Sequence, residues 1–118
     1  MGLFRRKQRP GTLRRADSED VAHLVAWAQS RTGVEAYVEP RTAVTDTTMA
    51  LVARDGEWTR RRVEDERAAA ELGKRLGIPV YDVHRTGYPP RMREWTRRRS
   101  EEEKAARRLI EDAFGNEG

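Results

Sequence analysis

The chain contains no cysteine among its 118 residues. This absence excludes disulfides, thiolate zinc sites and thiol nucleophiles, and it favours a cytoplasmic location. No apolar run approaches the ~20 residues that cross a bilayer. The opening MGLFRRKQRP also lacks the apolar core of a secretory signal. We therefore expect a protein without a transmembrane segment.

Motifs for cofactors and metals are also absent from the sequence. There is no G-x-G-x-x-G, no Walker A loop and no H-E-x-x-H, and only two histidines occur. Asp82 and His84 stand two apart at the end of a predicted strand and could act as carboxylate and base. Such a pair also arises readily by chance. We expect no cofactor and no metal, and no catalytic residue is assigned, so enzymatic activity stays an open question.

Charge is distributed unevenly along the chain. Residues 1–15 hold six basic residues and no acidic one, and residues 85–99 hold six arginines against Glu94. Residues 16–84 are mildly acidic, and so is the C-terminal part. Basic arms of this kind suggest a polyanionic partner such as RNA or DNA. Arginine outnumbers lysine 21 to 3, however, and GC-rich coding would also produce that bias.

Residues 16–84 are predicted to form the folded core. Within them, Thr48 to Val83 reads as strand, turn, strand, helix and strand. Asp55-Gly56 is typical of a two-residue type I′ hairpin turn, which would place Ala53 opposite Trp58. We expect the Trp58 face to be buried together with Leu51, although a one-residue slip would exchange the two faces.

Two amphipathic helices accompany these strands. The first is predicted from about residue 18 to 32, with Val21 on its apolar face, Trp27 at the edge of that face and His23 pointing away. The second is predicted to end at Gly77, and Gly73 inside it would allow close packing on the sheet. A strand over residues 34–38 precedes the hairpin, and another over 78–83 follows the second helix. The predicted fold class is α+β, in the order α-β-β-β-α-β with a mostly antiparallel sheet, followed by one or two C-terminal helices.

The segment 85–99 combines aromatic side chains with arginines. Tyr88 precedes two prolines that force an extended backbone, and Pro90 then suits the first turn of a short helix. Single-stranded nucleic acid is bound by such mixtures through stacking and phosphate neutralisation. Alternatively, the aromatic residues anchor the segment to the core and the arginines are merely solvated. The predicted nucleic-acid or partner-binding residues are Arg60, Arg61, Arg62, Tyr88, Arg91, Arg93, Trp95, Arg97, Arg98 and Arg99.

Residues 100–115 are predicted to form an amphipathic C-terminal helix. Ser100 and Glu103 have the spacing of a capping box. An apolar stripe runs over residues 105–114 and contains Leu109, Ile110 and Phe114. Such a stripe packs on its own domain, on a second copy or on another protein.

Two resemblances bear on these expectations. The first five elements share their order with the double-stranded RNA-binding domain. Where that family has a lysine cluster this chain has the acidic stretch 64–67, so no residue is carried over. The runs GVEAYVEPRTAVTDTTMALVARDGEWTRRRV and LGKRLGIPVYDVHRTGYPPRMREW resemble a family of small actinobacterial proteins over residues 1–99. Many members carry the label oxidoreductase, which the resemblance implies here.

We therefore expect a non-catalytic module that binds RNA or a ribonucleoprotein through its arginine-rich segments. An oxidoreductase, as the family label implies, is one alternative. An accessory subunit that binds a protein partner through the C-terminal helix is the other.

Overall fold

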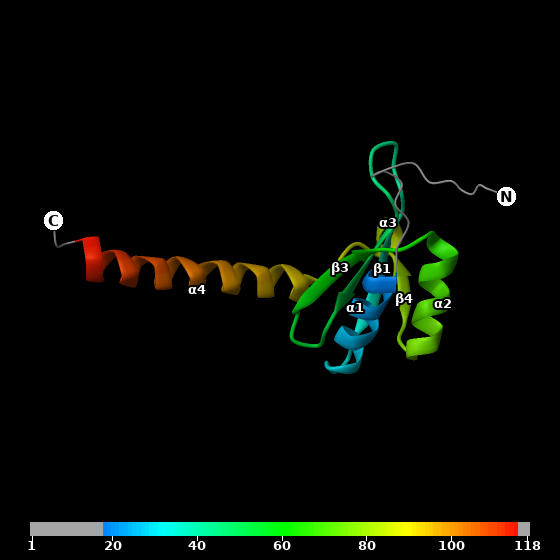
Figure 1. The fold of residues 1–118 in the computed structure, drawn as a ribbon, viewed down its shortest axis with the longest axis horizontal. Coiled ribbons are helices and arrows are strands. Elements are labelled where there is room, and N and C mark those ends of the chain that lie inside the picture. Colours follow the sequence, from blue (N-terminus) through cyan, green and yellow to red (C-terminus); the bar gives the residue numbers. More distant parts are fainter. Residues whose placement is uncertain (1–17, 116–118) are drawn as a thin grey trace.

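A computed structural model describes residues 18–115, and the basic arm predicted at residues 1–15 lies outside them. Its elements are α1 (Ser18–Gln29), β1 (Glu35–Glu39), β2 (Thr48–Val52), β3 (Trp58–Arg62), α2 (Glu66–Leu76), β4 (Val80–Asp82), α3 (Val83–Thr86) and α4 (Pro90–Gly115) (Figure 1). The predicted α+β class and the order of the first six elements are confirmed. The last strand is shorter than predicted, because Val83 already begins α3.

The four strands form one mixed sheet in the order β3-β2-β1-β4. β1 pairs with β2, and β2 with β3, in the antiparallel sense. β4 lies parallel to β1 on the other side, because the chain crosses over through α2 before it returns to the sheet. The sheet is therefore mostly antiparallel, as predicted.

One face of the sheet is covered by α1 and α2, and this layer contains the main core. Leu24 of α1 is fully buried, and Ala69 and Leu72 of α2 are buried beside it. The strands contribute Ala36, Val38, Met49 and Leu51, and Ala53 follows directly after β2. The predicted apolar face of α1 is slightly wrong, because Trp27 is buried and Val21 is exposed. Burial of the large indole removes more apolar area from water than burial of a valine does.

The register of the β2–β3 hairpin differs from the prediction. Val52, not Ala53, lies opposite Trp58, and Leu51 lies opposite Thr59. The backbone N–H of Gly56 donates to the carbonyl of Ala53 at 2.9 Å, and Gly56 has a φ of 97°. The connection is thus a three-residue loop ending in a left-handed glycine, not a two-residue type I′ turn. This one-residue shift moves Trp58 to the sheet face opposite Leu51.

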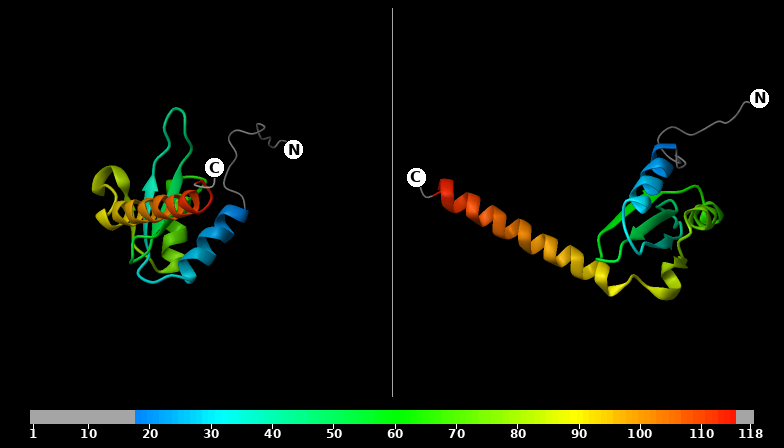
Figure 2. Two further views of the ribbon diagram at one scale, coloured as in Figure 1. Left: turned by 90° about the vertical axis from the view of Figure 1, so that its left-hand side faces the viewer. Right: turned by 90° about the horizontal axis from the view of Figure 1, so that it is seen from below.

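The second face of the sheet is covered by the start of α4. Met92 packs there with Tyr37, Ala50 and Val52, and Trp58 lies against this smaller cluster. After this first contact α4 leaves the domain and extends away from it (Figures 1 and 2). The longest dimension of the molecule is accordingly 66 Å, against 33 and 27 Å for the others.

The separate helix predicted to begin at Ser100 is wrong, because α4 runs unbroken from Pro90 to Gly115. Ser100 lies in the middle of α4. Arg97 bonds Glu101 at 3.2 Å and Arg99 bonds Glu103 at 3.5 Å, and both pairs span Ser100. Pairs of this i,i+4 type stabilise a continuous helix on either side of a serine that is not otherwise favourable there.

Gly73 lets α2 approach β4 closely, as predicted. A Cβ atom added to Gly73 would lie 2.1 Å from Cγ2 of Val80. We expect Gly73→Ala to lower the free energy of unfolding by about 1–2 kcal/mol, because overpacking outweighs the better helix propensity of alanine. Urea unfolding followed by tryptophan fluorescence measures this.

The matched control is the double variant Gly73→Ala/Val80→Ala. It removes the clashing methyl groups of Val80, so its free energy of unfolding should equal that of Val80→Ala alone. A Gly73→Ala variant as stable as the parent protein would contradict the close contact.

Candidate nucleic-acid interface

Aromatic side chains gather on the second face of the sheet. Tyr37 of β1 stacks on Tyr81 of β4 with ring centroids 5.3 Å apart, and Tyr88 lies 6.5 Å from Tyr37 at a tilt. Tyr81 and Tyr88 are 36 % and 40 % exposed. Trp58 is half-buried on β3 of the same face. The face therefore presents several partly accessible rings between the edge strands and the linker into α4.

An open groove of about 600 Å³ lies between this face and α4. Its lining residues are Trp58, Tyr88, Met92, Arg93, Thr96, Arg97, Ser100, Glu101 and Lys104. Arg93 and Arg97 stand four residues apart and Lys104 follows Arg97 by seven, which places all three on one side of α4. Glu101 is the acidic member of the lining, and its 3.2 Å bond to Arg97 is exposed on both sides. Such an exposed pair contributes little and opens easily, so the groove is basic and apolar in character.

Trp58 is fixed as one wall of the groove. Its indole N–H donates to the Thr96 hydroxyl oxygen at 2.9 Å, and the Thr96 hydroxyl in turn donates to the carbonyl of Met92 at 3.1 Å. The guanidinium of Arg60 lies 5.1 Å from the indole centroid, within cation–π range. The ring is thus oriented before any ligand arrives, which lowers the entropic cost of stacking on it.

Tyr88 is held by a polar network around Glu39. The Tyr88 hydroxyl donates to one Glu39 oxygen, and Arg60 binds the carboxylate with two nitrogens at 2.8 Å each. The Thr48 hydroxyl completes the set at 2.5 Å. Burial alone would raise the pKa of Glu39, but the hydrogen bonds from Arg60, Thr48 and Tyr88 outweigh it and lower the pKa. Glu39 is therefore a charged acceptor that ties the linker before α4 to the sheet.

Arg91 has a structural role, although the sequence predicts it as a binding residue. It donates to the carbonyl of Ala53 at 2.9 Å and to Glu35 at 2.8 Å. The hydrogen bond from Arg91 is the main cause that lowers the pKa of Glu35. Burial, followed by the hydrogen bond to Glu35, raises the pKa of Tyr37 to about 12, so this phenol stays protonated and donates to Glu35.

The three arginines of β3 do not form one patch. Arg60 faces the groove side, whereas Arg61 lies on the opposite face and contacts Asp20 of α1 at 3.5 Å. Arg62 contacts Asp46 at 3.7 Å. Because successive side chains of a strand alternate between faces, Arg60 and Arg62 share one face and Arg61 lies on the other. Of the three, only Arg60 lies beside the groove.

Part of the predicted α4 set also lies away from the groove. Trp95 packs beside the hairpin turn, where a Cβ on Gly56 would lie 2.9 Å from its Cβ. The guanidinium of Arg99 lies 5.3 Å from the Trp95 ring, and Arg98 is exposed outside the groove lining. Tyr88, Arg93 and Arg97 are the predicted residues that line the groove itself.

The sequence prediction missed Thr96, Ser100 and Lys104, and it placed Trp58 on the wrong face of the sheet. The spacing of residues 93, 97, 100 and 104 marks one helix face, but it is visible only if α4 is taken as a single helix. Trp58 was not included because the predicted hairpin register turned it toward the main core. The groove depends on both features.

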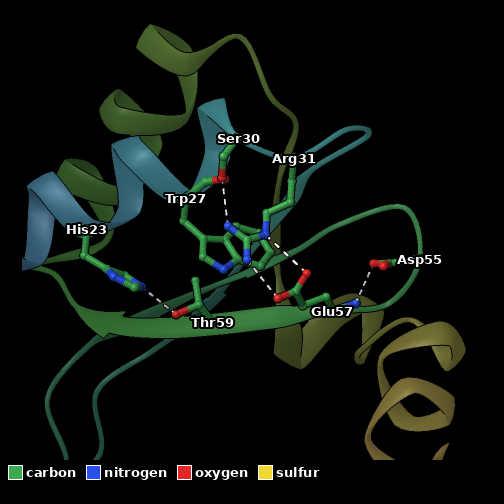
Figure 3. Close-up of polar contacts among 7 residues, drawn as sticks. All are labelled: His23, Trp27, Ser30, Arg31, Asp55, Glu57 and Thr59. Carbon is green, nitrogen blue, oxygen red and sulfur yellow. Dashed lines mark hydrogen bonds and ion pairs between the residues drawn. The ribbon is translucent and has the colours of Figure 1, made fainter. Parts of the chain in front are cut away.

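His23 and its surroundings form a structural cluster on the other face of the sheet (Figure 3). The His23 ring is half-buried and lies 2.7 Å from the Thr59 hydroxyl, so the prediction that it points away from the apolar face of α1 is wrong. Burial, then the charge of Arg61, lowers the pKa of His23. Arg31 covers the Trp27 ring at 4.4 Å and binds Glu57 at 2.8 Å, which ties the turn after α1 to the residue before β3 (Figure 3).

Asp82 and His84, which the sequence offers as a carboxylate and a base, lie together at the start of α3. The Asp82 carboxylate accepts from the backbone N–H of His84 at 2.8 Å and caps α3, so it has a structural partner. Within residues 18–115 no three His, Cys, Asp or Glu side chains are close enough to hold a metal ion. The helices of that range are also too short or too polar to span a membrane.

Comparisons with protein-family models, curated proteins and solved structures found no match to this chain.

Proposed function

We propose that this protein binds single-stranded RNA in the groove between β3 and α4. The observation that carries the proposal is the meeting of two rings, Trp58 and Tyr88, with three cations, Arg93, Arg97 and Lys104, around one open groove. Stacked bases use the rings, and the cations neutralise the backbone phosphates. The groove is open, as a strand that passes through it requires.

The cations set the expected salt dependence. Each phosphate contact on a single strand contributes about −0.7 to the slope of log affinity against log salt. Three cations along the groove therefore predict a slope of about −2 or steeper. Fluorescence anisotropy with a labelled oligouridine of about 12 nucleotides, a length within the usual site sizes, measures it. An affinity that does not change between low and moderate salt would contradict the proposal.

The groove arginines can be separated from general basicity by a matched pair of variants. Arg93→Gln/Arg97→Gln should weaken binding about tenfold or more at low salt and reduce the slope by about 1.4. The control is Arg67→Gln/Arg75→Gln, two exposed arginines of α2, which covers the opposite face of the sheet. Both double variants remove two charges, so an equal loss from each would show that binding is not located in the groove.

We also propose that the protein docks another protein chain through the distal part of α4. This second function is favoured by the exposure of Leu109, Ile110 and Phe114, which are 70, 57 and 72 % accessible. A pull-down from nuclease-treated lysate, with the parent protein and with Leu109→Glu/Phe114→Glu, tests it. A partner that is recovered equally by both baits would not be bound through these residues.

A further inference from the structure

The distal part of α4, residues 97–115, is not buried against its own domain. Every residue from Arg97 to Gly115 is exposed, and the helix extends away from the sheet (Figures 1 and 2). At 1.5 Å per residue this part is about 27 Å long. An uncovered helix that carries three large apolar side chains needs a partner surface to remove them from water.

The apolar side chains form one stripe with a repeating pattern of sizes. At about 100° per residue, Ala106, Ile110 and Ala113 lie near its centre, with Leu109 on one flank and Phe114 on the other. A two-fold axis between Leu109 and Ile110 would bring an antiparallel second copy into matching layers. Leu109 then lies level with Ile110 of the other copy, Ala106 with Ala113, and Phe114 with the small Ala105. The two large central side chains thus share the middle layers, and the alanines share the layers beside them.

Charge complementarity supports the same arrangement. Arg107 and Glu111 lie on the Phe114 flank of the stripe, and the antiparallel two-fold brings the same flank of both helices together. Arg107 of each copy then faces Glu111 of the other, which gives two opposite-charge pairs across the interface. A parallel two-fold would instead bring this flank beside the opposite, Leu109 flank of the other copy, so these two pairs would not form. Charge pairing at flanking positions is the feature by which helices choose orientation and partner.

We propose that two copies of this chain associate through residues 105–114 of α4, as an antiparallel helix pair centred between Leu109 and Ile110. The inference rests on the docking role of the stripe and is independent of RNA binding. The two domains lie at opposite ends of the pair, because each contacts its own α4 only through residues near Met92 and Thr96. The interface, ten residues of one helix from each copy, is small beside the ~800 Å² per partner of standard complexes, so the dimer is reversible.

Sedimentation equilibrium on nuclease-treated protein tests the pairing. The apparent mass should rise from the 13.6 kDa of one chain toward twice that value between low micromolar and near-millimolar concentration. Leu109→Glu/Phe114→Glu should shift the midpoint at least about tenfold upward in concentration. The control is Val44→Glu, because Val44 is an apolar residue 88 % exposed on the loop between β1 and β2. It should leave the midpoint unchanged.

A charge exchange tests the orientation and the identity of the partner together. Arg107→Glu alone and Glu111→Arg alone should each be monomeric, since each places like charges across the pair. An equimolar mixture of the two variants should recover the dimer, because every cross-pair is then of opposite sign. A parent protein that stays monomeric throughout, or a mixture that stays monomeric, overturns the self-pairing. Neither result changes what the RNA titration or the pull-down shows. A failure of self-pairing can therefore be told apart from a failure of RNA binding or of docking to another protein.

Discussion

Gly56→Ala should lower the free energy of unfolding by about 3 kcal/mol, which is a large effect for one added methyl group. Gly56 has a φ of 97°, where an L side chain is strained by about 1–2 kcal/mol. Its new Cβ would also lie 2.2 Å from the carbonyl oxygen of Arg91 and 2.9 Å from Cβ of Trp95. The first turn of α4 must therefore move, and overpacking of this kind costs about 1–3 kcal/mol. Urea unfolding measures the loss.

Gly77→Ala is the matched control for this prediction. Gly77 also has a positive φ, 69°, but a Cβ there would meet nothing within 4 Å. The control therefore shows the backbone strain without the contact and should cost about 1 kcal/mol. Hydrogen exchange should also rise in residues 91–96 for Gly56→Ala and not for Gly77→Ala. Equal losses from the two variants would mean that α4 does not rest on the hairpin turn.

The elements of the core were predictable because their signals are local. Asp65 caps α2 through a 2.8 Å bond to the backbone N–H of Ala68, and Gly77 ends that helix in the left-handed conformation that its position predicted. Ala69 and Leu72 recur at the period of a helix and are buried. Each of these features is decided within one or two turns of chain, so a single sequence contains the necessary information.

The hairpin register was not predictable from the same kind of signal. Asp55-Gly56 fits a two-residue type I′ turn, and it also fits a three-residue loop that ends in a glycine bulge. Local turn preferences do not distinguish the two-residue turn from the three-residue loop. In the folded protein Ala53 accepts from Arg91 while Gly56 packs against the backbone of that residue, and both contacts come from a helix far along the chain. Tertiary contact therefore fixes which face carries Trp58.

The candidate site depends on these non-local choices. Once Val52 lies opposite Trp58, the indole reaches Thr96 and forms the groove wall, a bond between residues 38 positions apart. The continuity of α4 is the second feature, after the hairpin register, on which the site depends. Ser100 suits an N-cap and is tolerated inside a helix, and the energies of the two options differ little. The sequence therefore supplied Tyr88, Arg93 and Arg97, but not the face that joins them to Trp58.

Glu39→Gln should lower the free energy of unfolding by about 1–2 kcal/mol at neutral pH. The Glu39 side chain is only 14 % exposed and accepts from Arg60, Thr48 and Tyr88. A glutamine of the same shape cannot accept at both ends, and it leaves Arg60 without a counter-ion. The loss stays moderate because the Arg60 side chain is 40 % exposed and can be hydrated instead. Release of Tyr88 should also loosen the linker before α4 and lower the affinity for RNA.

The lowered pKa of Glu39 determines how this loss of stability changes with pH. The pKa of Glu39 is lower in the folded protein than the ordinary value of 4.5. Its contribution to stability is therefore complete above about pH 4.5 and is lost as the pH falls through the lower, folded value. The stability curve of Glu39→Gln should then be flatter below pH 4.5, and the difference from the parent protein should shrink with acid. Glu102→Gln, at an exposed glutamate of α4, is the control for the loss of one carboxylate. A Glu39→Gln curve that runs parallel to the parent curve would mean that Glu39 is no better stabilised in the fold than in the unfolded chain.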